Sequence, residues 1–339
     1  MVFMWAGLPD YGARLIRAFI ESGTAEVQVI ATLPSVPILG MEQSLGQAVL
    51  WIKDDAPVTW QSLGLRVPDV LFQGGWAQAS FRSLAAEARL QGSKIVLMND
   101  QNWQGGLRHR IVDPLRYRAK YLKKFDAAFG PGKSGARYAR AMGFPPSRIV
   151  TGLYGADPIV FYGGSPLKLR PKSFLFIGQL IARKNILNLV QAFLKIAVEF
   201  PDWKLIICGS GKLQPQIPVH WQIQVQGFVQ PIELAEKLRL SRCLVLPSLE
   251  EHWGLVVHEA ASCGCALALS NTVGSAVDFT TETFNPRDLK AMENALRRIA
   301  AWTDEEWERA DTTSRQAAQQ FGPAQFARSV QHLVDELLK

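Results

Sequence analysis

CLVLPSLEEHWGLVVHEAASCGCALALS, residues 243–270, alternates apolar and polar segments in the order of a strand, a loop, a helix and a second strand. The apolar run at 244–246 is of the continuous kind expected for a parallel strand buried on both faces. A loop leads to a helix that begins near Leu255 and ends at Gly264, a favoured residue for the left-handed position after a helix. The chain re-enters the sheet at 266–269. This order predicts an α/β domain with a parallel sheet.

Two carboxylates frame the start of the predicted helix. Glu251 lies in the loop, and Glu259 lies just over one turn into the helix. Because helical side chains tilt toward the helix N-terminus, Glu259 is aimed back toward Glu251. Ligands of such sheets bind at the carboxyl ends of the strands, where helix N-termini present N–H groups to anions. The simpler alternative is an acid that only complements the helix dipole.

The whole string closely resembles the motif of family 4 retaining glycosyltransferases of the GT-B fold, in which a Glu, any residue, an aromatic, Gly and Leu lead to a second Glu. The residues that carry the resemblance are Glu251, His252, Trp253, Gly254, Leu255 and Glu259. The resemblance implies that Glu259 holds the ribose hydroxyls of a nucleotide, since a carboxylate accepts from two vicinal hydroxyls. It also implies that Glu251 and the backbone of 252–254 address the donor sugar.

A second string, FIGQLIARKN at 176–185, resembles the family's Gly-Arg-Leu, three residues, Lys-Gly or Lys-Asn. In the family the Arg and Lys hold the donor diphosphate, which gains negative charge as the glycosidic bond breaks. Lys184 follows Gly178 at the Lys position and is implied to be catalytic together with Glu251, whereas Gln179 replaces the Arg as a neutral hydrogen-bond partner. Arg183 could compensate, although its position places it on a different face from Gln179. A cation is disfavoured at a helix start, which itself indicates a function for Lys184.

Further donor-side residues follow two other predicted strands. Gly209 begins a Gly-Ser-Gly turn, and Gly227, Phe228 and Val229 follow the next strand. Plain turn chemistry is the alternative for each. The resemblance places both segments beside the nucleotide, with the backbone near Val229 reading the base.

The first half of the chain matches the family only in outline. Gly12 stands where members use a Gly-Gly turn before a helix, but Tyr11 replaces one of the two glycines. Many members place a His after the strand that corresponds to 94–98, where this chain has Asn99 and Asp100. His109 lies further on in a basic segment, and a surface residue is the simpler interpretation. Gly12, Asn99 and Asp100 are therefore the candidates on the acceptor or phosphate side.

Regular strand–helix alternation in both halves predicts two doubly wound parallel sheets. With the resemblance, the expected architecture is GT-B: two Rossmann-like domains that face a cleft, with the C-terminal helix crossing back to the first. We expect an acceptor-side domain at 1–160, a nucleotide-sugar-binding domain at 161–322 and the returning helix at 323–339. Glycines and prolines between 163 and 171 read as the linker. One helix is expected over 41–52, and only helices after residue 270.

Composition indicates a soluble globular protein, with 48% hydrophobic and 20% charged residues. There is no run of 18 apolar residues and no signal-peptide pattern. The four cysteines all fall in the second half of the chain, and three of them lie in or beside predicted buried strands, so reduced thiols and a cytoplasmic location are expected. Of the net charge of +7, residues 1–165 contribute +6, from 18 Lys and Arg against 12 Asp and Glu.

Much of this charge lies in a predicted basic helix between Arg108 and Lys124. Its cations are Arg108, Arg110, Arg116, Arg118, Lys120, Lys123 and Lys124. Together with interleaved aromatic and leucine residues they suit an anionic membrane surface or an acidic acceptor. A solvated helix face is an equally good interpretation. Nucleic acid is not expected, because no recognised binding module accompanies the charge.

The sequence thus predicts a metal-independent glycosyltransferase of the hexosyltransferase type, peripheral at the inner face of the membrane, in cell-surface polysaccharide or glycolipid synthesis. Its expected partners are a nucleotide sugar and a carbohydrate or glycolipid acceptor. No cofactor or metal is expected, because Lys184 and the helix N-terminus at Leu255 take the role of a divalent cation. Two alternatives remain: a nucleotide-sugar-binding protein with impaired catalysis, suggested by Gln179 and Tyr11, and a GT-B epimerase of nucleotide sugars.

Overall fold

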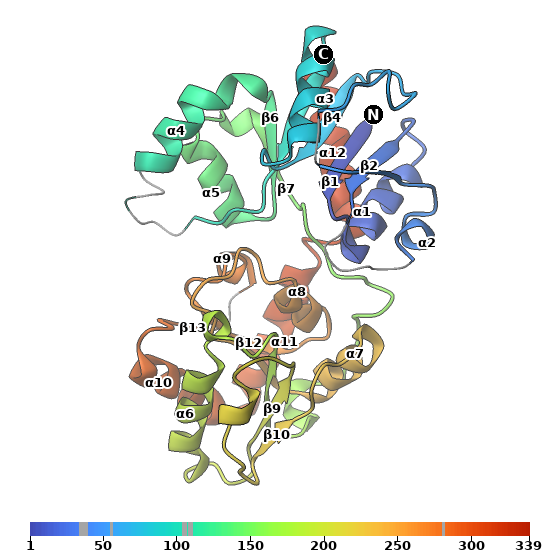
Figure 1. Ribbon diagram of the computed structural model, residues 1–339. Coiled ribbons are helices and arrows are strands. Elements are labelled where there is room, and N and C mark those ends of the chain that lie inside the picture. The colour runs from blue at the N-terminus through green and yellow to red at the C-terminus, as the bar shows by residue number, and fades with distance from the viewer. Residues whose placement is uncertain (34–39, 55–56, 104–106, 108–110, 280–281) are drawn as a thin grey trace. The chain divides into compact units, whose positions relative to one another are not determined.

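The computed structural model describes residues 1–33, 40–54, 57–103, 107, 111–279 and 282–339, and it divides into two compact units (Figure 1). Unit 1 is made of Met1–Gly155 and Gly322–Lys339, whereas unit 2 is the uninterrupted segment Ala156–Phe321.

Unit 1 contains a parallel sheet of seven strands in the order β3-β2-β1-β4-β5-β6-β7. The strands are β1 (Val2–Ala6), β2 (Gln28–Thr32), β3 (Leu50–Ile52), β4 (Val70–Gly74), β5 (Lys94–Met98), β6 (Ala127–Gly130) and β7 (Ile149–Thr151). The helices are α1 (Asp10–Ile20), α2 (Met41–Leu45), α3 (Ala79–Leu90), α4 (Asp113–Lys120), α5 (Lys133–Ala141) and α12 (Pro323–Leu338), with short 3₁₀ turns η2 (Leu122–Lys124) and η3 (Pro146–Arg148).

Both faces of this sheet are buried by helices. Successive strand residues point to opposite faces, so each strand contributes to two core clusters. Phe3 and Phe72 belong to a core cluster with α1 and α12, whereas Met4 and Leu71 belong to a second cluster with α3 and α5. The apolar runs of the sequence are therefore continuous rather than alternating.

The last helix, α12, completes the core of unit 1. Its residues Phe326, Val330 and Leu333 are at most 1% exposed and pack in the cluster that contains Phe3 and Phe129. Figure 1 shows α12 beside α1 and β1, at the opposite end of the chain's colour scale. The predicted return of the C-terminal helix to the first domain is confirmed.

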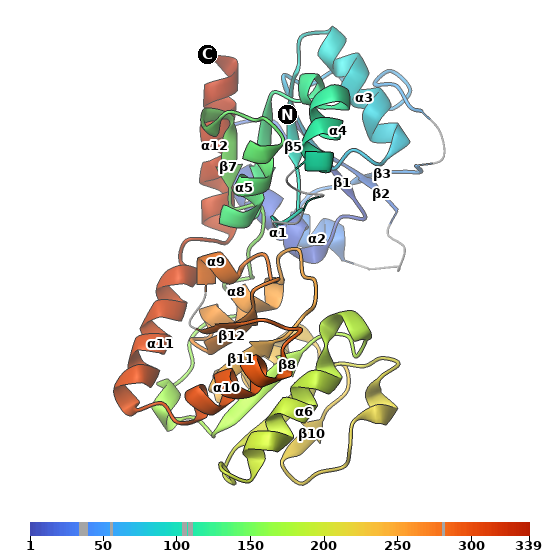
Figure 2. The ribbon, with the colours of Figure 1, turned by 90° about the vertical axis from the view of Figure 1, so that its left-hand side faces the viewer.

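Unit 2 contains a parallel sheet of six strands in the order β10-β9-β8-β11-β12-β13. The strands are β8 (Ser173–Ile177), β9 (Lys204–Cys208), β10 (Ile223–Val225), β11 (Cys243–Leu246), β12 (Ala266–Ser270) and β13 (Glu282–Phe284). The helices are α6 (Ile186–Ala197), α7 (Pro231–Leu240), α8 (Leu255–Ser262), α9 (Ala276–Phe279), α10 (Leu289–Ala300) and α11 (Asp304–Ala318), with 3₁₀ turns η4 (Leu167–Leu169), η5 (Ala182–Lys184) and η6 (Gln214–Gln216). Figure 2 shows α6 and α10 side by side over one face, where they pack on Phe174 and Phe176. The strand order is that of a Rossmann fold, so the predicted fold class is confirmed.

Two element predictions were wrong at the sheet edges. The helix expected over 41–52 ends at Leu45, Gly46 follows with φ of 82°, and the chain continues into the edge strand β3. After residue 270 the edge strand β13 precedes the predicted helices. Strands of three residues are too short for a periodic signal, and their pairing with a neighbour is a tertiary effect.

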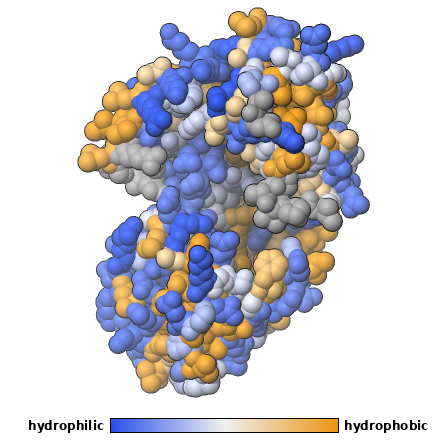
Figure 3. All heavy atoms as spheres, viewed as in Figure 1, coloured by the Kyte–Doolittle hydropathy of each residue, from blue (hydrophilic) through white to orange (hydrophobic). Residues whose placement is uncertain are grey.

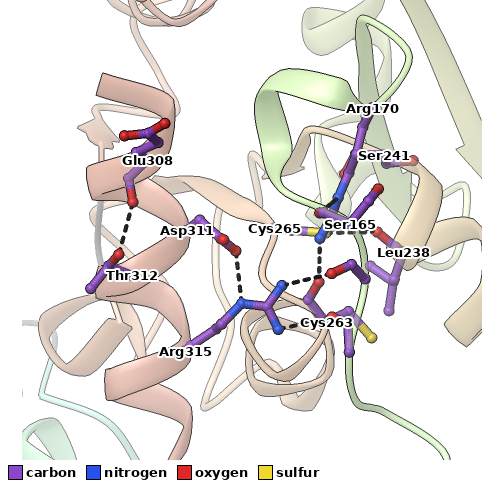
Figure 4. Close-up of polar contacts among 12 residues, drawn as sticks. Ser165, Arg170, Leu238, Ser241, Cys263, Cys265, Glu308, Asp311, Thr312 and Arg315 are labelled. Carbon is purple, nitrogen blue, oxygen red and sulfur yellow. Dashed lines mark hydrogen bonds and ion pairs between the residues drawn. The ribbon is translucent and has the colours of Figure 1, made fainter. Parts of the chain in front are cut away.

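The glycine-rich segment expected as a linker belongs to unit 2, and the structure places the division at Gly155 rather than after residue 160. The segment is held by two arginines (Figure 4). Arg170, 2% exposed, donates to the carbonyl oxygens of Ser165, Leu238, Ser241 and Cys263 at 2.7–3.1 Å.

The second arginine, Arg315, pairs with Asp311 at 2.8 Å and donates to the carbonyl oxygens of Gly163 and Gly164. Burial of so many carbonyl groups requires donors, and the two guanidinium groups supply them. Gly163 and Gly164 therefore form a fixed turn on the surface of unit 2.

The basic segment is helical over much of the part that the structure describes. It forms α4 and η2, while Arg108, His109 and Arg110 lie outside the described residues. Among the described helices, none is long and apolar enough to cross a membrane.

Candidate functional site

The two predicted catalytic side chains meet in unit 2. Lys184 ends η5, Glu251 lies in the loop after β11, and the ammonium group of Lys184 is ion-paired with the carboxylate of Glu251. Both side chains are about one-seventh exposed, at 13% and 14%. Ser248 Oγ donates to the same carboxylate at 3.4 Å. The resemblance alone predicted these residues at one site, and the structure brings them into contact.

A second cation converges on the same carboxylate. Nη1 of Arg183 donates to the carbonyl oxygen of Glu250 at 2.8 Å and lies 3.7 Å from Glu251 Oε2. Gln179 is exposed and lines a cavity that Arg183 does not line. Two positive charges are thus available beside Glu251, although the family's Arg position holds a neutral residue.

The backbone conformation after Lys184 explains why an Asn follows this lysine. Asn185 has φ of 59° and is the one residue other than glycine with positive φ within the described ranges. Gly and Asn tolerate this conformation best. Asn185 Nδ2 also donates to the carbonyl oxygen of Pro286 at 2.8 Å, which fixes the start of α6. The turn holds Lys184 at the end of η5, facing the loop after β11.

A cavity of about 480 Å³ opens at the carboxyl ends of β8 and β9. Its lining includes the predicted residues Gly178, Gln179, Gly209, Phe228 and Val229. Gly227 adjoins it, since its carbonyl oxygen accepts from Gly209 N at 2.6 Å. The predicted turn glycines therefore gather round one hollow.

Close backbone approach requires glycine in this cavity wall. A Cβ at Gly209 would lie 1.9 Å from the carbonyl oxygen of Gly178, and one at Gly211 would lie 2.6 Å from that of Leu180. Lys212 also lines the cavity and was missed by the sequence analysis. Its position directly after Gly-Ser-Gly was the available signal.

The loop into α8 holds Gly254 close to Glu251. Gly254, with φ of 77°, precedes α8, and a Cβ there would lie 3.2 Å from Glu251 Cγ. Leu255 begins the helix, whose first turn has no side-chain cap. The His252 side chain is 41% exposed. Trp253 is 3% exposed and packs on aromatic rings of unit 2, so only its backbone is placed near Glu251.

Glu259 lies on α8 just over one turn beyond Leu255 and is neither fully buried nor fully exposed. Loss of hydration raises the pKa of its carboxyl to about 7. Among the described residues it has no hydrogen-bond or ion-pair partner. Its carboxylate is therefore desolvated without a compensating charge or donor in the part of the chain that the structure describes.

The neighbour of Glu259 was not predicted. His258 is buried, its Nδ1 accepts from Ala156 N at 2.9 Å, and its Nε2 therefore donates to the carbonyl oxygen of Ala318 at 3.1 Å. Burial lowers the pKa of this imidazole to about 4. The neutral ring ties both ends of unit 2 to α8 and thereby fixes the helix that carries Glu259.

In unit 1, the residues predicted on the acceptor side are not equivalent. Gly12 lies inside α1 and is buried, with the Pro9 ring 3.3 Å from the position of a Cβ, so it is not an open turn. Asn99 is 7% exposed, and its side-chain oxygen accepts from Gln101 N at 3.2 Å. Asp100 is partly exposed and takes part in a different network.

Asp100 accepts a hydrogen bond from Tyr154, and the hydroxyl of Tyr154 is also hydrogen-bonded to the hydroxyl of Tyr11. The two tyrosine rings stand edge to face at 5.2 Å. Burial raises the pKa of Tyr154 well above its ordinary value and that of Tyr11 to about 12. The tyrosine that replaces a family glycine thus belongs to a chain of hydroxyls that ends on Asp100.

Comparison with known proteins agrees with this geometry. Residues 164–320 match the family Glycosyl transferases group 1. Two relatives are an uncharacterised glycosyltransferase of Methanocaldococcus jannaschii, 32% identical over 110 residues, and the O-antigen chain mannosyltransferase B of Escherichia coli, 29% identical over 158 residues. These matches cover 30% and 43% of this chain, and 28% and 40% of the relatives' length.

Among solved structures, HepE of Anabaena in complex with UDP aligns with a TM-score of 0.75 at 14% identity, over 99% of both chains. At this identity the likeness shows the fold alone. The fold is GT-B.

Proposed function

We propose that this chain is a retaining glycosyltransferase that moves a sugar from a nucleotide-diphosphate sugar to an acceptor hydroxyl. The observation that carries the proposal is the pairing of Lys184 with Glu251 in the segment that matches Glycosyl transferases group 1. The nearby start of α8 and the unpartnered carboxylate of Glu259 support it.

In this reaction the bond between the anomeric carbon and the phosphate oxygen breaks, and its electron pair goes to the leaving nucleoside diphosphate. The acceptor oxygen bonds to the anomeric carbon, and its proton leaves with the phosphate or to water. Lys184, Arg183 and the N-terminus of α8 stabilise the charge that develops on the phosphate. Glu251 holds Lys184 in place before the donor binds.

The cavity at Gly209 would receive the base and ribose, with Glu259 accepting from ribose hydroxyls. HepE was solved with UDP, which supports a nucleotide as the ligand of this fold. Similarity to an O-antigen mannosyltransferase supports a place in cell-surface polysaccharide or glycolipid synthesis. We further propose a hexosyl donor and no divalent metal, since the cations beside Glu251 already oppose the phosphate charge.

A thermal-shift screen against UDP-, GDP- and ADP-sugars tests the proposal. A donor at a hundred times its dissociation constant should stabilise the protein by about 2.7 kcal/mol. With the stabilising donor, release of nucleoside diphosphate should depend on an acceptor and persist in the presence of a chelator. Absence of any stabilisation by all three classes would contradict the proposal.

The neutral Gln179 favours one alternative, a binding protein with impaired catalysis. It would give donor stabilisation without release of nucleoside diphosphate. An epimerase would change the donor sugar with no acceptor present. Analysis of the sugar product with and without acceptor separates both from transfer, and the anomeric configuration of a transfer product tests retention.

On unit 1, we propose that α4 and η2 bring the protein to an anionic membrane surface. Exposed apolar side chains here include Val112, directly before α4, and Leu115 of α4, at 55% and 64%, and the same helix carries Arg116, Arg118 and Lys120. Such a combination suits the headgroup region of a bilayer. Flotation with anionic vesicles tests it.

A further inference from the structure

A groove separate from the donor site lies in unit 1, along α3 and beside η2. Its volume is about 280 Å³. The lining that matters here is Trp76, Arg82, Ala85, Arg89, Tyr121 and Lys124, with Phe125 also in contact. Neither the family match at 164–320 nor the glycosyl-transfer chemistry includes these residues.

The body of the groove is apolar and aromatic. The rings of Trp76 and Tyr121 are stacked at 5.5 Å with an interplanar angle of 23°, and both rings also contact Tyr117 of α4. Phe125, only 7% exposed, and the small Ala85 complete the lining. This surface suits a hydrocarbon chain, because it offers ring faces and little that can hydrogen-bond.

The rim of the groove is basic. The ammonium groups of Lys120 and Lys124 lie 5.4 and 5.7 Å from the centre of the Tyr121 ring, and neither lysine has an ion pair within the described residues. Arg89 is paired at 3.0 Å with Asp126, whose carboxylate also accepts from Ile95 N.

The one acid of α3, Glu87, accepts from Trp60 N at 3.1 Å and is turned to that loop. At the opposite end of the groove Arg82 donates to the carbonyl oxygens of Trp76 and Ala77. Positive charge is therefore in excess round an apolar groove, which complements an anion with a hydrocarbon body.

The groove adjoins an exposed apolar surface on α4. Figure 3 shows hydrophobic side chains gathered over this helix, where Leu115 is exposed, and Ile111 and Val112 directly before the helix are exposed as well. Tyr117, on the same helix, reaches the groove through its contact with Trp76. The exposed apolar residues near α4 and the aromatic groove are therefore linked by one buried ring, Tyr117.

We propose that this groove binds an anionic lipid, with its chain along Trp76 and Tyr121 and its headgroup at Lys124 and Lys120. This deepens the membrane association proposed above, and it does not depend on the donor site. The chain and the headgroup are recognised by separate parts of the groove, so neither a free anion nor a neutral amphiphile should bind as well.

Calorimetry on the full chain with decyl phosphate, kept below its micelle concentration, tests the groove without a membrane. We expect saturable binding that weakens about tenfold in Tyr121→Ala and about tenfold in Lys124→Ala. Inorganic phosphate and decyl maltoside should each bind at least about tenfold more weakly than decyl phosphate. Trp221→Ala and Lys195→Ala, exposed positions of unit 2, serve as matched controls that should bind normally.

Flotation with phosphatidylcholine vesicles, with and without phosphatidylglycerol, separates the groove from general membrane association. Leu115→Asp should reduce flotation but leave decyl phosphate binding intact. Tyr121→Phe guards against misfolding, since it keeps the ring and should bind normally. Unchanged decyl phosphate binding in both Tyr121→Ala and Lys124→Ala would overturn the proposal that the groove binds a lipid, even if the protein still binds vesicles. Inorganic phosphate that binds as tightly as decyl phosphate would overturn it too.

Discussion

Replacement of Glu259 by Gln should make the ligand-free protein more stable and the nucleotide site weaker. In the folded protein the carboxyl keeps its proton up to a pKa of about 7, whereas the ordinary value for the unfolded chain is 4.5. The unfolded state therefore binds fewer protons between these values, so stability falls as pH rises from 4.5 to 7. Below pH 4.5 this loss is absent, and above pH 7 it is complete.

The magnitude follows from the raised pKa of Glu259. The difference from the ordinary value corresponds to about 3 kcal/mol at pH 8, and partial exposure of the side chain reduces this to about 2 kcal/mol. Gln has nearly the same shape and carries no charge. Glu259→Gln should therefore gain about 2 kcal/mol over the wild type at pH 8 and almost nothing at pH 4.5.

Urea unfolding of both proteins at several pH values measures the gain in stability. The pKa of His258 on the same helix is lowered to about 4, so this residue destabilises the fold as pH falls below 6.5. This effect is common to both proteins and cancels in the difference. A variant that is less stable at pH 8, or a difference that does not change with pH, would refute the reasoning.

Binding of a nucleotide sugar should show the opposite preference. Ribose hydroxyls donate to the ionised carboxylate, so wild-type affinity should weaken as pH falls below about 7, by at most about tenfold per pH unit. In Glu259→Gln this dependence should disappear and affinity at pH 8 should be lower. The esterified diphosphate of the donor keeps its charge over this range, which leaves the protein as the titrating partner.

Three further predictions concern the charge, the backbone and the acceptor side. Lys184→Ala should lower kcat/KM about a hundredfold, because a cation beside the leaving diphosphate is lost, and Lys184→Arg should restore part of it. Gly209→Ala should abolish thermal stabilisation by donor and cost about 1–3 kcal/mol in urea unfolding, since a Cβ there would lie 1.9 Å from the Gly178 carbonyl oxygen. Tyr154→Phe should lower kcat about tenfold with little change in donor KM, and move the acid limb of the pH profile upward, because Asp100 loses a hydrogen-bond donor.

Matched variants control for general effects. Lys195→Ala removes an exposed cation from α6, Gly64→Ala strains a positive φ of 66° with nothing within 4 Å, and Tyr162→Phe alters an exposed tyrosine. Normal turnover in Lys184→Ala would exclude the lysine from the chemistry. Donor stabilisation retained in Gly209→Ala would separate the cavity from the donor site, and a pH profile unchanged in Tyr154→Phe would leave the tyrosine a structural role.

Much of the fold was predictable because its signals are local. Strands such as β5 and β8 are continuous apolar runs bounded by turn residues, and their predicted bounds match the structure. The edge strands β3 and β13 were missed because three residues carry no period of their own. The linker was misplaced because the carbonyl oxygens that bind Arg170 come from distant parts of the chain.

The candidate site also has a part that the sequence predicted and a part that depends on tertiary contacts. The family resemblance of the two motifs predicted Lys184 and Glu251 at one site. It could not show that Arg183 turns toward Glu251, because that contact depends on how η5 meets a loop 67 residues away. The hydrogen bond between Tyr154 and Asp100 likewise joins the ends of two strands that are distant in sequence. The motif requires an aromatic residue at Trp253, but it does not reveal that this side chain is buried.

The placement of α12 has a consequence for synthesis on the ribosome. Unit 2 is one unbroken segment, so it can fold as soon as it has emerged. Unit 1 begins earlier in the chain yet needs Phe326, Val330 and Leu333 to close its core, so the part of its apolar sheet face that α12 covers stays open while the whole of unit 2 is translated. The half of the protein that is made first is therefore the half that finishes folding last, and it is the half most exposed to misfolding in the interval.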